Sequence, residues 1–176
     1  MASLTLGSVN FPTTASVNAP DTIRYLAHRM KQQGVKPELE VFDIGMIEFA
    51  RVLIAEGLLT PPHYFNLILG NVSGLQARPE HLAIALTSLP EHSLLSVGGI
   101  GRHQRTATAW GITAADGIRI GLEDNLWVEW EPDKVPASNA DLVDTALAIS
   151  NAMGRAVATA EEVRERLGLR QSYGAA

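Results

Sequence analysis

The feature of this sequence that most constrains its fold is a series of short apolar runs at nearly regular spacing. The runs begin near residues 3, 38, 65, 94 and 118, so successive starts lie 35, 27, 29 and 24 residues apart. Each interval is long enough for one helix that crosses back between two strands. Repeated strand–helix units of this kind predict an α/β domain with a parallel sheet and right-handed connections.

Local signals place the individual elements. The expected strands cover 3–9, 38–43, 65–70, 94–98 and 118–123, the expected helices cover 20–34, 46–59, 79–89, 102–115, 139–153 and 159–167, and a frayed tail is expected over 170–176. Gly34 suits a helix end, Pro79 a first helical turn and Ser138 a helix cap. Thr159 and Glu162 have the spacing of a capping box.

The alternation of side chains along the strands separates two architectures. In the runs at 3–7, 38–42 and 118–123, apolar residues on one face alternate with residues on the other that, apart from Phe42, are polar, ionisable or glycine. A central strand of a doubly wound sheet is covered by helices on both faces and is expected to be apolar on both. A barrel strand has helices outside and a lumen inside that can carry catalytic groups. The pattern therefore favours the parallel (β/α)8 TIM-barrel class.

Composition excludes several kinds of function. The chain has 14 Lys+Arg and 19 Asp+Glu, a net charge of -5, so no nucleic-acid partner is expected. With no Cys, it has no disulfide, thiolate zinc ligand or cysteine nucleophile. Charges or glycines interrupt the apolar stretches before about 18 residues, so no membrane partner is expected. No linker divides residues 1–176, which are predicted to form a single domain.

The densest group of candidate catalytic residues is RIGLEDN at 119–125. Arg119 and Glu123 share a face of the predicted strand, and Asp124 begins the following loop. Catalytic groups of (β/α)8 enzymes lie at the carboxyl ends of strands, which is where this group is predicted to lie. The alternative is that Arg119 and Glu123 only neutralise each other in the lumen, although such a buried pair is costly to desolvate.

Three residues on earlier strands are further candidates. Glu40 lies near the end of its strand and could contribute to the site, cap a loop or pair with Lys36. Ser3 and Thr5 place hydroxyls on one strand face, where they could bind a substrate carboxylate. The more common role of such hydroxyls is to hydrogen-bond neighbouring backbone, and this alternative stays open.

A glycine run at Gly98, Gly99 and Gly101, followed by Arg102, lies between a strand and a helix. Free backbone N–H groups at a helix N-terminus form a natural anion site, and (β/α)8 barrels often bind phosphate after their seventh or eighth strand. The run lacks the spacing of a dinucleotide fingerprint.

The histidines do not predict a complete metal site. Residues 28, 63, 81, 92 and 103 show neither H-x-H nor H-E-x-x-H spacing. Catalytic zinc normally takes three protein ligands. Only His103, just after the glycine run, lies near the predicted active face.

Seven motifs follow one another along the chain: SLTLGSVNF at 3–11, KPELEVFD at 36–43, EGLLTPPHYFNLILG at 56–70, VGGIGRHQ at 97–104, RIGLEDNLW at 119–127, SNADLV at 138–143 and ATAEEVRERLGL at 158–169. In this order they resemble the β-keto acid cleavage enzymes. The resemblance covers nearly the whole chain, and RIGLEDN and PELEVFD are its most specific motifs.

The resemblance implies a zinc-bearing (β/α)8 barrel. Such an enzyme converts a β-keto acid, such as 3-keto-5-aminohexanoate, and acetyl-CoA into acetoacetate and a new CoA thioester. By resemblance, Glu123 is a zinc ligand, Asp124 is the base that acts on the substrate, and Arg119 is the arginine that holds it. The residues matched to substrate-contacting lumen positions are Glu40, Ser3 and Thr5. A divalent cation chelated by a keto oxygen and a carboxylate stabilises the enolate that forms when the carbon bond breaks.

The resemblance also implies an incomplete barrel. In the family, an early strand carries the two zinc histidines as an H-x-H pair, whereas this chain begins at what corresponds to the fourth strand. A full barrel takes about 250 residues, or about 31 per unit, so five units account for about 155. We expect a fragment of a longer protein, or a truncated product that starts at an internal methionine, without the first three units.

Two classes of function are therefore expected. The first is a cytoplasmic acyltransferase, homo-oligomeric by resemblance and inactive without the missing units, whose CoA phosphate is expected at the glycine run. The second is a non-catalytic half-barrel that acts as an assembly or binding module, because open sheet edges at 3–9 and 118–123 would expose unpaired backbone groups. A phosphate-binding barrel of another chemistry rests on the glycine run alone.

Overall fold

The centre of the protein is a five-stranded parallel sheet. The structure, a computed structural model, describes residues 1–169. The strands, in the order β1-β4-β5-β6-β7 across the sheet, are β1 (Ala2–Thr5), β4 (Pro37–Val41), β5 (His63–Leu69), β6 (Ser93–Gly99) and β7 (Gly117–Ile118). Every neighbouring pair is parallel. The predicted parallel α/β class is therefore confirmed.

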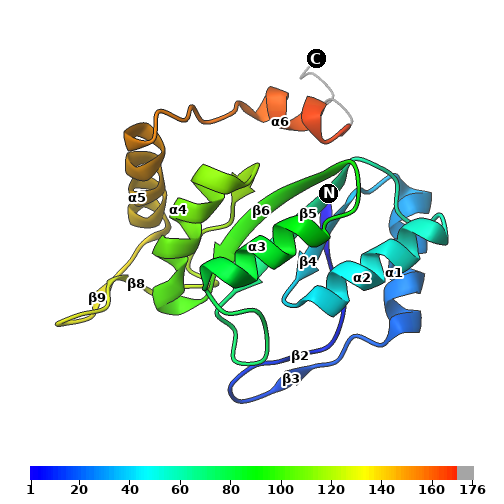
Figure 1. Ribbon diagram of the computed structural model, residues 1–176, viewed down its shortest axis with the longest axis horizontal. Coiled ribbons are helices and arrows are strands. Elements are labelled where there is room, and N and C mark those ends of the chain that lie inside the picture. The colour runs from blue at the N-terminus through cyan, green and yellow to red at the C-terminus, as the bar shows by residue number, and fades with distance from the viewer. Residues whose placement is uncertain (170–176) are drawn as a thin grey trace.

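The first four helices connect the strands of the sheet and cover one of its faces, and the last two follow the final strand. They are α1 (Pro20–Gln33), α2 (Ile44–Ala55), α3 (Pro79–Ser88), α4 (Gln104–Ala114), α5 (Asn139–Ala152) and α6 (Ala160–Arg166), with a short 3-10 turn η1 (Gly101–His103) before α4. Figure 1 shows α2 and α3 in front of the sheet. The predicted signals are confirmed at Gly34, which has a φ of 64°, and at the capping boxes that begin at Ser138 and Thr159.

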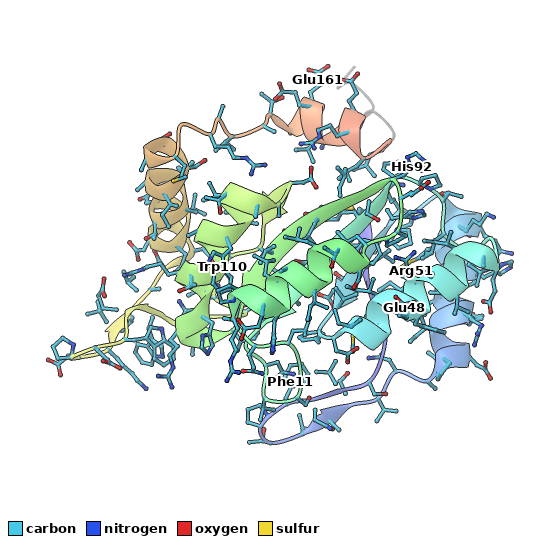
Figure 2. All side chains as sticks on the ribbon, viewed as in Figure 1. Phe11, Glu48, Arg51, His92, Trp110 and Glu161 are labelled. Carbon is cyan, nitrogen blue, oxygen red and sulfur yellow. The ribbon has the colours of Figure 1, made fainter. Side chains whose placement is uncertain are left out.

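The two faces of the sheet differ as the alternation predicted. Leu39, Phe65 and Leu95 occupy one register across β4, β5 and β6, and all three are buried in the core with the helices. Glu40 and Asn66 occupy the next register, on the opposite face. Charged side chains lie on the outer side of α2, where Arg51 Nε is 3.4 Å from Glu48 Oε1 (Figure 2). The polar face of the sheet thus corresponds to a barrel lumen.

Two predicted strands are shorter in the structure than in the sequence pattern. The strand expected over 3–9 ends at Thr5, and the chain then enters a hairpin of β2 (Val9–Asn10) and β3 (Ala15–Ser16). The strand expected over 118–123 ends at Ile118, because the chain turns at Gly121, where φ is 147°. A second hairpin, β8 (Trp127–Glu129) with β9 (Val135–Pro136), was also not predicted. Both hairpins follow the carboxyl ends of strands; in Figure 1 the β2–β3 hairpin lies at the bottom of the molecule and the β8–β9 hairpin at its left edge.

Two helix boundaries also differ. The helix expected over 46–59 begins at Ile44 and ends at Ala55, since Gly57 adopts a φ of 69° and the Leu58 N–H turns back to the Leu53 carbonyl at 2.9 Å. The helix expected over 102–115 starts as the η1 turn. The predicted frayed tail lies outside the described residues. Within residues 1–169 we find no helix of the length and apolar character needed to cross a membrane.

The buried histidine at the start of β5 is expected to make stability depend on pH. His63 is 5% exposed, and burial, followed by the charges of Lys36 and His92, lowers its pKa below the usual 6.5. Below that value the unfolded chain binds a proton that the folded chain does not, so stability falls as the pH falls.

We predict that His63→Gln removes this part of the pH dependence, at most about 1.4 kcal/mol per pH unit. Urea unfolding of the wild-type and variant chains between pH 7.5 and 5.5 measures it. The same slope in both chains would contradict the assignment.

Candidate active site

The centre of the candidate site is a two-pronged contact between Arg119 and Asp124. Arg119 follows β7 directly, and its Nε donates to Asp124 Oδ2 at 2.7 Å while its Nη2 donates to Oδ1 at 3.2 Å. The side chain of Asp124 is only 5% exposed and that of Arg119 is 18% exposed. Fork-to-fork contacts of this type are the strongest and most directional that a carboxylate makes.

A tight turn returns Asp124 to the arginine. Gly121, in a conformation that glycine adopts readily, accepts hydrogen bonds at its carbonyl from the N–H groups of Asp124 at 3.2 Å and Asn125 at 3.1 Å. The Asp124 carbonyl in turn accepts the Gly101 N–H at 2.7 Å. The backbone around the carboxylate is therefore fixed from both sides, by its own turn and by the start of η1.

Glu40 joins the same group from β4. Arg119 Nη1 donates to Glu40 Oε1 at 2.8 Å, and Thr5 Oγ1 donates to Glu40 Oε2 at 2.7 Å. Lys36 does not pair with Glu40, since it donates to the backbone carbonyls of Thr60 and Pro62. Of the alternatives left open for Glu40, the structure therefore has it in the Arg119 network.

Three carboxylates surround this one guanidinium. Glu123 Oε2 lies 3.2 Å from Arg119 Nη2, but its side chain is 84% exposed. Burial alone lowers the pKa of Arg119, but the hydrogen bond to Asp124 and the charges of Asp124, Glu123 and Glu40 outweigh burial and raise it. Arg119 therefore stays charged, and the simple Arg119–Glu123 pair is the weakest and most exposed part of a larger network. Three carboxylates against one guanidinium leave two negative charges uncompensated.

A second polar group lies one layer deeper in the lumen. Glu38 accepts hydrogen bonds from Ser3 Oγ at 3.1 Å and from Asn66 Nδ2 at 2.5 Å. Ser3 is exposed, and its hydroxyl is engaged by this carboxylate rather than by backbone. Neither Glu38 nor Asn66 was predicted as a site residue. Glu38 alternates with Leu39 as Glu40 does, so the pattern could have identified it, whereas Asn66 lies inside an apolar run.

Two cavities meet at the Arg119–Asp124 pair. The larger, of 380 Å³, is lined by Glu38, Tyr64, Asn66, Ser96, Ile118, Arg119, Ile120, Glu123 and Asp124. The smaller, of 160 Å³, is lined by Thr5, Val9, Phe11, Ser16, Glu40, Phe42, Ile68, Ile100, Arg119, Glu123 and Asp124. The β2–β3 hairpin closes part of the smaller cavity, with Phe11 packed edge-on against Phe42. A small molecule in either cavity would contact the same carboxylate and guanidinium.

The glycine run serves close packing. A Cβ on Gly98 would lie 3.0 Å from Arg119 Cβ, and one on Gly99 would lie 2.8 Å from the His103 carbonyl. The N–H groups expected to be free are largely engaged, as the Gly101 N–H donates to Asp124 and the Ile100 N–H to Leu69. The predicted anion site at Gly98, Gly99, Gly101 and Arg102 therefore rests mainly on the exposed Arg102 side chain.

The neighbouring His103 packs against Gly70 at the end of β5. It does not gather with other metal-binding side chains. Within residues 1–169, no three His, Asp or Glu side chains are placed to hold one metal ion. Glu123, an exposed residue that lines both cavities, could supply one ligand, but the described residues do not by themselves fit a zinc ion.

Comparison with curated proteins identifies similar enzymes. The chain is 38% identical over 171 residues to 3-keto-5-aminohexanoate cleavage enzyme of Acetoanaerobium sticklandii. The matched region covers 96% of this chain and 62% of that protein. It is 37% identical to 3-oxoadipate:acetyl-CoA acetyltransferase of Cupriavidus necator, in a match that covers 96% of this chain and 60% of that protein. It is 33% identical to 3-dehydrocarnitine:acetyl-CoA trimethylamine transferase of Rhizobium meliloti, in a match that covers 96% of this chain and 56% of that protein. The chain thus spans about three-fifths of the length of its relatives.

Solved structures and a family model agree with these matches. The apo structure of ObcA superposes with a TM-score of 0.68 at 22% identity, over 95% of this chain and 43% of that one, and shows the fold, a section of a (β/α)8 barrel. The family model for beta-keto acid cleavage enzymes matches residues 1–169. By this match and by the identities of its relatives, the chain belongs to the β-keto acid cleavage enzyme family.

Proposed function

We propose that the complete protein containing this chain is an acyltransferase that converts a β-keto acid and acetyl-CoA into acetoacetate and a new CoA thioester. The observation that carries the proposal is the buried Arg119–Asp124 contact, which opens on two cavities in a chain of this family. Relatives named as acetyl-CoA transferases support acetyl-CoA as the co-substrate.

In this proposal Asp124 is the base that takes a proton from the substrate. Its carboxylate is shielded from water, and each oxygen keeps a lone pair beyond the one that Arg119 occupies. Arg119 orients the carboxylate, and Glu40, held by Thr5, fixes Arg119 from the other side. The proton moves from the substrate carbon to an Asp124 oxygen, and the new enolate forms beside the guanidinium. In place of the substrate contacts expected for Ser3 and Thr5, we propose that their hydroxyls hold the carboxylates of Glu38 and Glu40.

The CoA phosphates are proposed to bind outside the lumen, near Gly101 and Arg102. A cavity of 290 Å³ lies between η1, the start of α4 and the β8–β9 hairpin, and its lining includes Arg102, Arg105 and Trp130. The guanidinium of Arg102 supplies a cation for a phosphate, and Arg105, which is paired with Glu129 at 3.0 Å, lies on the same cavity wall.

We propose that Glu123 is one ligand of a zinc ion whose other ligands come from outside this chain. The uncompensated negative charge around Arg119 favours a divalent cation at this position.

A second candidate function follows from the sheet edges. β1 and β7 are the outer strands of the sheet, and five strands do not close a barrel. Unpaired edge groups favour association with another strand. In this candidate the chain is an assembly module that pairs with a second copy or with a complementary barrel segment.

For zinc, the expected result is a substoichiometric content in the chain alone, because a single carboxylate does not retain the ion. Elemental analysis after dialysis measures it, with Glu123→Gln in parallel. When the chain is co-produced with the unmatched part of the Acetoanaerobium sticklandii enzyme, one zinc per complex is expected, and E123Q removes it. Stoichiometric, tightly bound zinc in the chain alone would contradict this assignment.

For the reaction, co-production with that same segment is expected to yield acetyl-CoA-dependent acetoacetate formation. Asp124→Asn is predicted to lower the rate by about 10²–10⁴-fold, the usual contribution of a general base. Asp21→Asn is the matched control, since the Asp21 side chain is fully exposed on α1 and, within residues 1–169, forms an ion pair with Arg24 alone, at 3.7 Å. If the D124N and D21N complexes form acetoacetate at the same rate, Asp124 is not the base.

For the edges, sedimentation velocity of the chain alone is expected to show self-association at micromolar concentration. Addition of the complementary segment is expected to replace the self-associated species by a one-to-one complex. A stable monomer without any partner would argue against open edges as an assembly device.

A further inference from the structure

The turn that carries Asp124 lies outside the strands of the sheet. Arg119 donates its N–H to the Val97 carbonyl at 3.0 Å, but residues 119–126 belong to neither a helix nor a strand. The sheet alone therefore does not set the position of Asp124. A proton transfer requires the base at a defined distance and direction from the substrate, and a misplacement of about 1 Å can cost about 10²-fold in rate. Contacts from other elements must hold this turn.

One such contact comes from α4. Gln104, the first residue of that helix, is only 2% exposed, and its Nε2 donates to the Gly121 carbonyl at 3.0 Å. The same oxygen accepts the N–H groups of Asp124 and Asn125. A buried amide is costly unless it is hydrogen-bonded, so an apolar residue would suit this position better if helix packing alone mattered. The amide of Gln104 thus serves the turn rather than its own helix.

A second contact comes from α5. Asn139 is the first residue of that helix, and its Oδ1 accepts the N–H of Leu122 at 3.0 Å. The helix does not need this side chain as a cap, because Ser138 and Asp141 already form a capping box there. A Cβ on Gly121 would lie 3.4 Å from the same oxygen, so the amide packs closely against the turn.

The two amides hold one peptide group. The carbonyl of Gly121 and the N–H of Leu122 belong to the same planar unit and point in opposite directions. Gln104 therefore holds one side of this unit and Asn139 the other. The helices that supply them, α4 and α5, lie side by side (Figure 1). Rotation of the peptide plane would break both contacts and would also take the carbonyl away from the N–H of Asp124.

We infer that Gln104 and Asn139 are positioning residues, which form an amide clamp on this peptide group and thereby set Asp124 for the proton transfer. The catalytic role of the clamp rests on the proposed function. Within residues 1–169, neither side chain lines the two cavities at the Arg119–Asp124 pair, so neither is placed to touch the substrate. Gln104 does line the 290 Å³ cavity, so a contact with CoA is the alternative that the test must separate.

The test uses the opposite hydrogen-bonding roles of the two amides. Gln104→Met removes the donor and Asn139→Leu removes the acceptor, whereas Asn139→Asp keeps an accepting oxygen. In the complex with the unmatched part of the Acetoanaerobium sticklandii enzyme, we expect Q104M and N139L each to lower kcat by about 10- to 100-fold. N139D is expected to recover most of the lost rate. The KM for acetyl-CoA is expected to change by less than about twofold, because the clamp acts on the base.

The matched controls are Gln33→Met at the exposed end of α1 and Asn151→Leu on an exposed position of α5. Both are expected to leave kcat and KM unchanged. Circular dichroism verifies that each variant is folded. Gln104→Glu, which also lacks the N–H donor, replaces Q104M if that variant loses its fold.

NMR with isotope-labelled arginine reports on the clamp without turnover. The Nε–H of Arg119 donates to Asp124 Oδ2 at 2.7 Å, so its signal depends on where the turn holds that carboxylate. D124N identifies the signal. In the full chain, alone and in the complex, we expect the signal to move and to exchange faster with water in Q104M and N139L. It is expected to stay in place in N139D and in the two controls.

An unchanged Arg119 signal in both Q104M and N139L overturns the clamp, and so does an N139D complex as slow as N139L. A raised KM for acetyl-CoA with unchanged kcat in Q104M makes Gln104 a CoA contact and also overturns it. If the wild-type complex forms no acetoacetate, the proposed function falls, and the Arg119 signal alone decides the clamp. If the signal moves as expected while D124N retains activity, the clamp stands and the proposed base falls.

Discussion

The candidate site depends on the guanidinium of Arg119. It connects Asp124 on the turn after β7 with Glu40 on β4, and Thr5 on β1 extends the same network to the edge strand. Because the Asp124 side chain is 5% exposed, loss of its counter-charge would leave a buried anion, which typically costs about 3–5 kcal/mol. The contact therefore positions the proposed base and also fixes the arrangement of the strand ends.

The lumen contains carboxylates in two different electrostatic environments. Glu40 and Asp124 share a cation, so their orientation is fixed, which suits a proton transfer that requires a defined geometry. Glu38 has hydrogen-bond donors but no cation among the described residues, so its charge remains available to a ligand. Relatives of this chain are named for substrates with different side chains.

Much of this organisation was predictable from local pattern. The strand–helix repeat predicted the parallel sheet, and the period-two alternation assigned Glu40 to the polar face. It assigned Glu38 to the same face, but only Glu40 was taken as a candidate, because Glu40 lies nearer the carboxyl end of the strand, where catalytic groups of a barrel are expected. Asn66 and Ser96 could not be found, since each lies inside an apolar run and becomes a cavity residue only through register with its neighbours. The two hairpins were missed because their strands are two or three residues long.

The sequence by itself determined the class of fold and the residue types of the site, because side-chain periodicity and helix signals act over a few neighbouring residues. Only the tertiary structure decided which of these side chains form ion pairs and hydrogen bonds with one another. Arg119 pairs with a glutamate 79 positions away, and its nearest acidic neighbour on the predicted strand face, Glu123, is mostly solvent-exposed. Parallel strands bring residues that are distant in the sequence into one register. The turn at Gly121 then places Asp124, rather than Glu123, in the buried position beside the guanidinium.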